Sequence, residues 1–77
     1  MLNIKILGPG CANCKKLEAL VRKVVAENKL EVEVEKITDF KEIMQWPILH
    51  TPGLVVNGKL VVSGRVPGEV EIAGFLK

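Results

Sequence analysis

Two cysteines carry the most direct chemical signal in the sequence. They are Cys11 and Cys14, separated by an Ala-Asn dipeptide, and the chain has no other cysteine. A disulfide between residues so close together removes little entropy from the unfolded chain, so we do not expect the pair to act as a stabilising cross-link. A Cys-x-x-Cys pair in a βαβ setting is typical of thiol–disulfide exchange. Our hypothesis is therefore that this disulfide is made and broken during function.

The residues before the pair predict a strand, and those after it predict a helix. Residues 3–7 are a short strand candidate, and the Gly-Pro-Gly segment 8–10 ends it, because this segment cannot continue a ladder. From Cys11 onward, apolar residues recur at helical spacing on one face, charged residues cover the other, and Asn28 is a plausible stop. The apolar set is Leu17, Leu20, Val21, Val24 and Val25. The cysteines thus stand where a strand turns into a helix.

This position gives each cysteine a different role. Cys11 lies at or just before the first helical turn, where free N–H groups and the helix dipole favour its thiolate and lower its pKa below the usual value of about 8.5. Cys14 follows about one turn later, so its sulfur can reach Cys11 but is shielded by packing. We expect Cys11 to attack a substrate disulfide and Cys14 to resolve the mixed disulfide. The exposed Lys15 and Lys16 add only weak positive potential.

The middle of the chain predicts an edge strand and a short helix. Residues 30–35 alternate strictly between apolar and glutamate side chains, which predicts a strand with one wet face at an edge of the sheet. Thr38 or Asp39 then caps a short helix that Pro47 prevents from extending. The apolar residues of that helix, which we assign to the core, are Phe40, Ile43 and Met44.

The last third of the chain predicts a hairpin and a final helix. Residues 54–56 and 59–62 are apolar strands joined by Asn-Gly, the sequence of a type I′ turn. Pro67 suits the first turn of the final helix, whose Val70, Ala73 and Leu76 are expected to face inward. The predicted fold class is α/β, in the order β-α-β-α-β-β-α, with one domain over residues 1–77. A right-handed crossover and an antiparallel hairpin give a mixed four-stranded sheet with helices packed on it.

Composition narrows the classes of function. A length of 77 residues with 48% hydrophobic content fits one small globular domain. The net charge of +2 comes from dispersed acidic and basic residues, so we expect no nucleic-acid partner. No stretch approaches the roughly 18 apolar residues of a membrane span, and the start lacks a signal-peptide pattern. We therefore expect no membrane partner and a cytoplasmic location, where thiols are kept reduced.

Two motifs in fixed order resemble a known family. The Cys-Ala-Asn-Cys segment 11–14 follows a strand and Gly-Pro-Gly, and a later Thr-Pro-Gly segment, 51–53, precedes Leu-Val-Val-Asn-Gly, 54–58. Over nearly the whole chain this resembles the small thioredoxin-like and glutaredoxin-like redox-active disulfide proteins of archaea and bacteria. The resemblance implies a minimal thioredoxin-like fold and thiol–disulfide oxidoreductase activity that needs no cofactor and no metal.

The resemblance also implies roles for residues outside the cysteine pair. In the thioredoxin fold, the proline before the third strand is cis and faces the Cys-x-x-Cys, which would put Pro52 beside Cys11. Thr51 would offer its backbone N–H and C=O to an extended substrate segment, and Gly10 is a third candidate substrate-binding residue. The implied partners are protein or small-molecule disulfides and an unidentified reductase or thiol donor.

The sequence departs from the thioredoxin pattern around the cysteines. No Trp precedes Cys11, the intervening dipeptide is Ala-Asn rather than Gly-Pro, and the first strand holds no acidic residue to act as a buried proton acceptor. These departures leave the reduction potential and the physiological reductant open.

Two other functions stay open at the level of sequence. A soft-metal carrier would bind Cu(I) with the two thiolates, although ferredoxin-like carriers end in a strand and commonly have Met where this chain has Pro9. A redox-responsive regulatory domain would cycle its disulfide without turning over a substrate.

A structural zinc site would need ligands from a second chain, because His50 is the only histidine. His50 could also stabilise a thiolate, but we favour a loop histidine with no catalytic part. Trp46 could contact a substrate, but we favour a role in packing.

Overall fold

The order of helices and strands is the one that the sequence predicts. The computed structural model describes residues 2–48 and 50–76. Its elements are β1 (Leu2–Leu7), α1 (Ala12–Glu27), β2 (Val32–Ile37), α2 (Phe40–Ile43), β3 (Gly53–Val56), β4 (Lys59–Ser63) and α3 (Glu69–Leu76). This is the β-α-β-α-β-β-α order of a minimal thioredoxin fold. It differs from the β-α-β-β-α-β order of a ferredoxin-like metal carrier.

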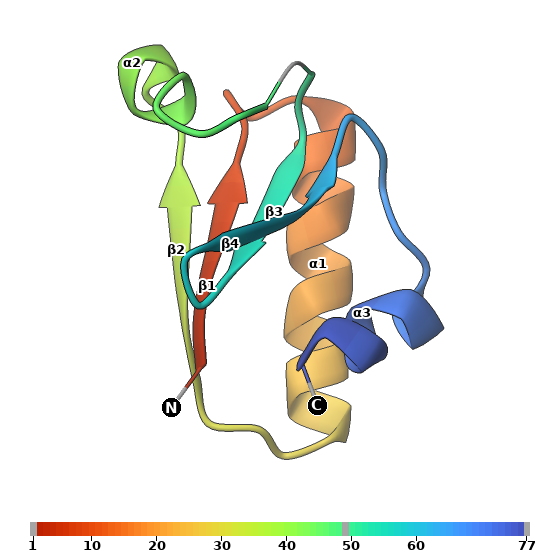
Figure 1. Ribbon diagram of the computed structural model, residues 1–77. Coiled ribbons are helices and arrows are strands. Elements are labelled where there is room, and N and C mark those ends of the chain that lie inside the picture. The colour runs from red at the N-terminus through yellow and green to blue at the C-terminus, as the bar shows by residue number, and fades with distance from the viewer. Residues whose placement is uncertain (1, 49, 77) are drawn as a thin grey trace.

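The four strands form one mixed sheet in the order β2-β1-β3-β4. β1 and β2 are parallel, as the long α1 between them requires, and β2 lies at the predicted edge. β3 runs antiparallel to both β1 and β4. Figure 1 shows that β1 and β2 point toward the end of the molecule where α1 begins and α2 lies. The topology thus gathers the cysteine segment, α2 and the start of β3 at one end of the sheet.

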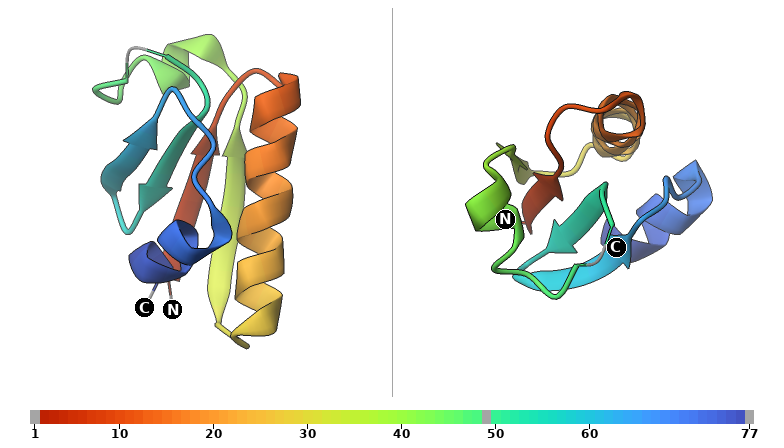
Figure 2. Two further views of the ribbon diagram at one scale, coloured as in Figure 1. Left: turned by 90° about the vertical axis from the view of Figure 1, so that its right-hand side faces the viewer. Right: turned by 90° about the horizontal axis from the view of Figure 1, so that it is seen from above.

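The helices cover the two faces of the sheet unequally. Figure 2 shows α1 and α3 on one side and the short α2 on the other. The core under α1 and α3 consists of Ile4, Ile6, Leu17, Val21, Val24, Leu54, Val56, Val62, Ile72 and Leu76. The smaller core on the α2 side consists of Leu7, Ile37, Ile43, Ile48 and Val55. In the described part of the chain, no helix combines the length and apolarity needed to cross a membrane.

Local turn and cap signals account for several boundaries. Asp39 is the N-cap of α2, and its carboxylate accepts a hydrogen bond from the Lys41 N–H at 2.9 Å. Asn57 and Gly58 have φ values of 50° and 81°, the left-handed conformation that a type I′ turn requires at both central positions. The predicted helix start and hairpin turn are therefore confirmed.

The second strand starts later than predicted because a capping motif follows α1. Asn28 is the C-cap, as predicted, and Lys29 adopts a φ of 51°. The N–H groups of Lys29 and Leu30 bond to carbonyls in the last turn of α1, at 3.3 and 3.1 Å, which is a Schellman motif. Leu30 therefore completes the capping motif that follows α1, and β2 runs over Val32–Ile37 instead of residues 30–35.

The prediction that Phe40 and Met44 lie in the core is wrong. They are 70% and 58% exposed, and Ile43 is the buried residue of α2. A helix of four residues is just over one turn long, so sequence periodicity cannot decide which of its residues face inward. Two large apolar side chains are thus left on the surface.

The inward face of α3 is confirmed at Leu76 and Ala73 but differs from the prediction at Val70. Val70 is 88% exposed, whereas Ile72 is fully buried and Leu76 is 4% exposed. The helix starts at Glu69, two residues after Pro67. Because each residue advances a helix by about 100°, residues 70 and 72 lie on opposite faces, and Ile72 shares the inward face with Leu76, four residues later.

Candidate active site

Cys11 is the residue on which α1 begins. It is the N-cap, with extended backbone, and its Sγ accepts a hydrogen bond from the Cys14 N–H at 3.2 Å. The Cys11 carbonyl accepts the first helical hydrogen bond, from the Lys15 N–H at 3.0 Å. The first turn of α1 contains no acidic residue. The sulfur of Cys11 therefore lies at the positive end of the helix dipole, close to a backbone donor.

The two cysteines form a disulfide and differ in exposure. Their sulfurs are bonded, and their Cα atoms are 5.0 Å apart. Cys11 is exposed, whereas Cys14 is 5% exposed and belongs to the buried face of α1. An incoming disulfide can therefore reach the sulfur of Cys11 more readily than that of Cys14.

Gly8 lies directly against the buried cysteine, a role that the sequence does not reveal. Gly8 is buried, and its N–H bonds to the Ile37 carbonyl at 2.9 Å. A Cβ at this position would overlap the Sγ of Cys14 and lie 3.1 Å from its Cβ. The sequence indicates only that Gly8 belongs to the segment that ends the first strand. The one signal in the sequence for its contact with Cys14 is its position between the first strand and the cysteines.

The backbone conformation at position 10 requires a glycine. Its φ of 97° lies in the left-handed region that side chains rarely adopt. A Cβ there would meet no other atom within 4 Å, so the requirement is conformational and not steric crowding. Gly10 directs the chain from Pro9 into the start of α1.

The Thr51–Pro52 segment precedes β3 and lies at the same end of the sheet as the cysteines. The peptide bond between Thr51 and Pro52 is cis. Gly53, the next residue, pairs with Leu7, after which the chain continues to Gly8 beside Cys14. The Pro52 carbonyl accepts a hydrogen bond from the Gly64 N–H at 2.8 Å. Pro52 is buried and Thr51 is exposed, so Thr51 is accessible next to a fixed proline.

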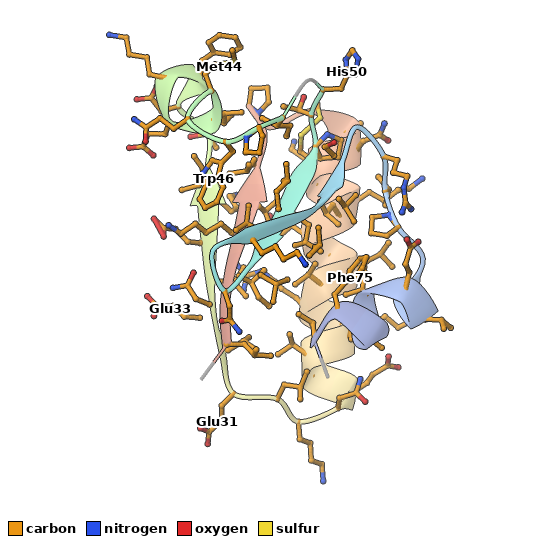
Figure 3. The ribbon with its side chains drawn as sticks, viewed as in Figure 1. Glu31, Glu33, Met44, Trp46, His50 and Phe75 are labelled. Carbon is orange, nitrogen blue, oxygen red and sulfur yellow. A yellow bond between two sulfur atoms is a disulfide. The ribbon has the colours of Figure 1, made fainter. Side chains whose placement is uncertain are left out.

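An apolar groove adjoins Thr51. It has a volume of about 280 Å³ and is lined by Phe40, Ile43, Met44, Ile48, His50 and Thr51. In Figure 3, Met44 and His50 lie at the end of the molecule where α1 begins, on opposite sides of this region. The exposed side chains of α2 thus continue the surface beside Thr51. Sequence analysis misses this groove because it places Phe40 and Met44 in the core.

His50 and Trp46 occupy different environments. His50 is exposed in the loop before Thr51, and a Cβ at Gly64 would lie 3.1 Å from its Cβ. Trp46 is partly buried against the smaller core, with the Lys5 ammonium 5.7 Å from its ring centroid. It lines a separate depression of about 420 Å³ with Lys5 and does not line the groove beside Thr51. These positions agree with a loop residue and a packing residue.

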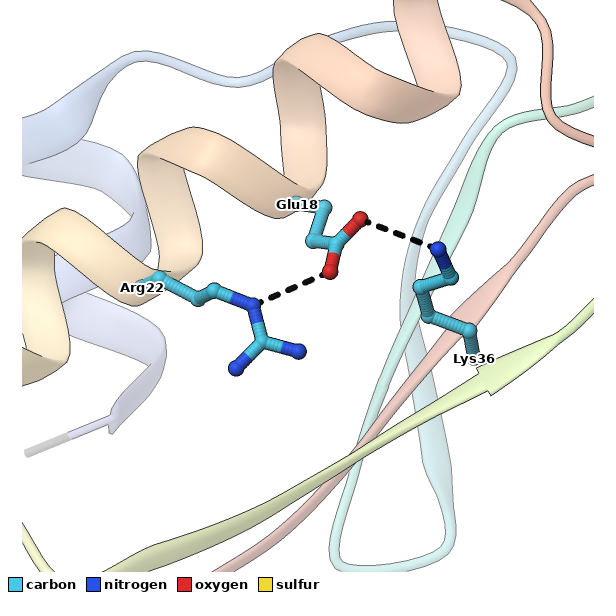
Figure 4. Close-up of polar contacts among 3 residues, drawn as sticks. All are labelled: Glu18, Arg22 and Lys36. Carbon is cyan, nitrogen blue, oxygen red and sulfur yellow. Dashed lines mark hydrogen bonds and ion pairs between the residues drawn. The ribbon is translucent and has the colours of Figure 1, made fainter.

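A small cavity borders Cys14. Its volume is about 50 Å³, and its lining residues are Ile6, Gly8, Gly10, Cys14, Lys15, Glu18, Lys36 and Thr38. Figure 4 shows Glu18 between Arg22 on the same helix and Lys36 on β2. Its Oε2 lies 3.0 Å from the Arg22 Nε, and its Oε1 lies 3.5 Å from the Lys36 Nζ. The hydrogen bond from Arg22, with help from Lys36, holds the pKa of the Glu18 carboxyl below its ordinary value, against the opposing effect of burial.

Within residues 2–48 and 50–76, no three His, Cys, Asp or Glu side chains gather as metal ligands would. The element order also differs from that of the ferredoxin-like carriers. The order of helices and strands therefore does not favour the carrier hypothesis over disulfide exchange.

Comparison with known proteins identifies the family. The model of the thioredoxin domain family matches residues 2–77. A thioredoxin of Methanothermobacter thermautotrophicus is 41% identical over 76 residues, covering 99% of both chains. A thioredoxin of Methanocaldococcus jannaschii is 36% identical over 77 residues, covering all of this chain and 88% of its own. The chain belongs to the thioredoxin family of thiol–disulfide oxidoreductases.

Proposed function

We propose that Cys11 is the attacking thiol and Cys14 the resolving thiol of this oxidoreductase. The observation that carries the proposal is the contrast in exposure between the two sulfur-bearing residues, with Cys11 exposed and Cys14 5% exposed. The position of Cys11 at the N-terminus of α1 supports it, since the helix dipole and the Cys14 N–H both stabilise a thiolate there.

The exchange takes place in two steps. The Cys11 thiolate attacks one sulfur of the substrate disulfide, forms a mixed disulfide, and displaces the other substrate sulfur as a thiolate. Cys14, after losing its proton, then attacks the Cys11 sulfur, closes the Cys11–Cys14 disulfide and releases the second substrate thiolate. The two substrate thiolates take up two protons, which balance those lost by the two cysteines. Two electrons pass from the protein dithiol to the substrate.

Substrate docking beside the cysteines involves Thr51, Pro52 and Gly10. Thr51 is exposed just before β3, where its backbone can pair with an extended substrate chain in the manner of strand addition. Pro52 is held by the hydrogen bond from Gly64, and Gly10 keeps the cysteine loop free of a side chain at this end of the sheet. The three residues would hold a substrate disulfide in front of Cys11.

The substrates that fit this surface best are protein disulfides with an apolar neighbour. The groove beside Thr51 has an apolar lining, and Phe40 and Met44 are exposed on its rim. A side chain next to the substrate cysteine would remove these two residues from water, which a small disulfide lacking such a group cannot do. Small-molecule disulfides would react more slowly for this reason.

A reductase or a low-molecular-weight thiol must return the Cys11–Cys14 disulfide to the dithiol after each cycle. This supply of electrons exists where the glutathione or thioredoxin systems, or their equivalents, keep thiols reduced. We therefore place the protein in the cytoplasm.

Reduction of an insulin-type disulfide, with a dithiol as electron source, tests the division of roles. We expect Cys11→Ser to abolish turnover and Cys14→Ser to accumulate a stable mixed disulfide between Cys11 and the substrate, visible as a mass adduct. Full activity in both variants would contradict the assignment. A disulfide that cycles reversibly in the wild type without turnover of any added substrate would favour the regulatory alternative.

A further inference from the structure

The buried position of Cys14 creates a need for a proton acceptor. Only the thiolate form of a cysteine is an effective nucleophile, and burial in apolar surroundings disfavours that form. Cys14 is 5% exposed, so bulk water does not take its proton freely. We propose that the Glu18 carboxylate accepts the proton that Cys14 loses as its sulfur attacks the mixed disulfide. This role rests on the proposed division between Cys11 and Cys14.

Glu18 is the residue of α1 best placed for this transfer. It follows Cys14 by four residues, so the two side chains are neighbours on one face of the helix. Both line the cavity of about 50 Å³, whose volume is sufficient for a water molecule. The cavity is also bordered by Lys36 and Thr38, which supply polar partners for such a water. The proton can pass from the Cys14 sulfur to the carboxylate directly or through this water.

Among the charged residues around the cavity, Glu18 is the one that can accept the proton from Cys14. The charged residues that line it are Lys15 and Glu18 from α1 and Lys36 from β2, while β1 contributes the apolar Ile6. A lysine ammonium group has only donors and no lone pair to offer. Arg22 and Lys36 hold the carboxylate ionised through contacts of 3.0 and 3.5 Å, as Figure 4 shows. Among the lining residues, Glu18 is therefore the one anion able to accept a proton at neutral pH.

The step balances as follows. The Cys14 S–H bond breaks and its proton passes to a Glu18 oxygen, while the Cys14 sulfur bonds to the Cys11 sulfur. The bond between Cys11 and the substrate sulfur breaks, and that sulfur leaves with the electron pair. The substrate thiolate then takes up this proton from Glu18, directly or through water. Glu18 returns to its ionised form, and the net electron transfer is unchanged.

Single-turnover kinetics with an aromatic disulfide that releases a coloured thiolate separates the two cysteines. The first phase, attack by Cys11, depends on the concentration of the disulfide, whereas the second, attack by Cys14, does not. We expect Glu18→Gln to slow the second phase by about tenfold or more near neutral pH and to leave the first phase unchanged. The loss should shrink as pH rises through the thiol pKa, because hydroxide then replaces the carboxylate as base.

The direction of the effect distinguishes a proton acceptor from a nearby charge. A carboxylate acting only through its charge disfavours the Cys14 thiolate, so neutralising it would speed the second phase. Glu27→Gln is the matched control, because Glu27 is an exposed carboxylate at the far end of α1.

Two results would overturn the proposal. They are a second phase in Glu18→Gln as fast as or faster than that of the wild type, and an equal loss in Glu27→Gln. Failure of the underlying assignment looks different, since the first phase would then survive in Cys11→Ser. The two failures can therefore be told apart in the same assay.

Discussion

Replacing Gly8 by alanine tests how tightly the backbone packs on the buried cysteine. The added Cβ would overlap the Sγ of Cys14 and lie 3.1 Å from its Cβ. In the oxidised protein this sulfur is fixed by its bond to Cys11 and by α1, so the backbone has to move. Overpacking of this kind costs about 1–3 kcal/mol. In the reduced protein the Cys14 thiol can adopt another rotamer, so the cost should be smaller.

The difference between the two forms sets the expected change in reduction potential. If the oxidised form alone is destabilised by about 1.4 kcal/mol, the potential rises by about 30 mV, because a two-electron couple converts at that ratio. We expect Gly8→Ala to lower the free energy of unfolding of the oxidised protein by about 1–3 kcal/mol and to make the disulfide easier to reduce. Urea unfolding of both forms and equilibration in thiol redox buffers measure the two quantities.

Gly68→Ala provides the control for this experiment. A Cβ at Gly68 meets no atom within 4 Å, so its effect on stability and on the potential should be small. A Gly8→Ala protein whose oxidised form loses less than about 0.5 kcal/mol would refute the packing argument. Equal losses in the oxidised and reduced forms would also refute it, because the clash would then not involve the disulfide.

Three further predictions concern the groove and α3. Joint replacement of Phe40 and Met44 by serine should lower kcat/KM for a protein disulfide by about tenfold, a loss of about 1.4 kcal/mol of binding, and leave a small aromatic disulfide unaffected; equal losses for both substrates would exclude docking in the groove. Gly74→Ala should raise the free energy of unfolding by about 1 kcal/mol, since Gly74 is exposed inside α3 with open space around its Cα; a lower melting temperature would contradict this. Ile72→Ala should cost about 2–5 kcal/mol in urea unfolding, whereas Val70→Ala should cost under about 0.5 kcal/mol, and the reverse order would place the wrong face inward.

The sequence predicts the parts of the fold that depend on strong local signals. The helical repeat after Cys11, the Asn57-Gly58 turn and the Asp39 cap each act within a few residues, and each is found where predicted. The parallel pairing of β1 and β2 follows from the length of α1, so the location of the cysteines at the carboxyl end of β1 is also predictable.

The features that sequence reasoning missed depend on contacts between distant segments. The exposure of Phe40 and Met44 is set by how α2 lies on the sheet, which a four-residue helix does not encode by periodicity. The contact of Gly8 with Cys14 and the cavity shared with Glu18 arise when α1 folds back over the sheet. The chemistry could therefore be predicted from the sequence, whereas the surroundings of the resolving thiol could not.

The pH dependence of alkylation of the reduced protein tests the central claim most directly. A thiol-specific alkylating agent is applied across a pH series, and the modified cysteine is identified by mass spectrometry. The predicted result is that Cys11 reacts first, with a pKa below the free-thiol value of about 8.5, while the buried Cys14 is protected. Faster modification of Cys14, or a Cys11 pKa at or above the free-thiol value, would contradict the account.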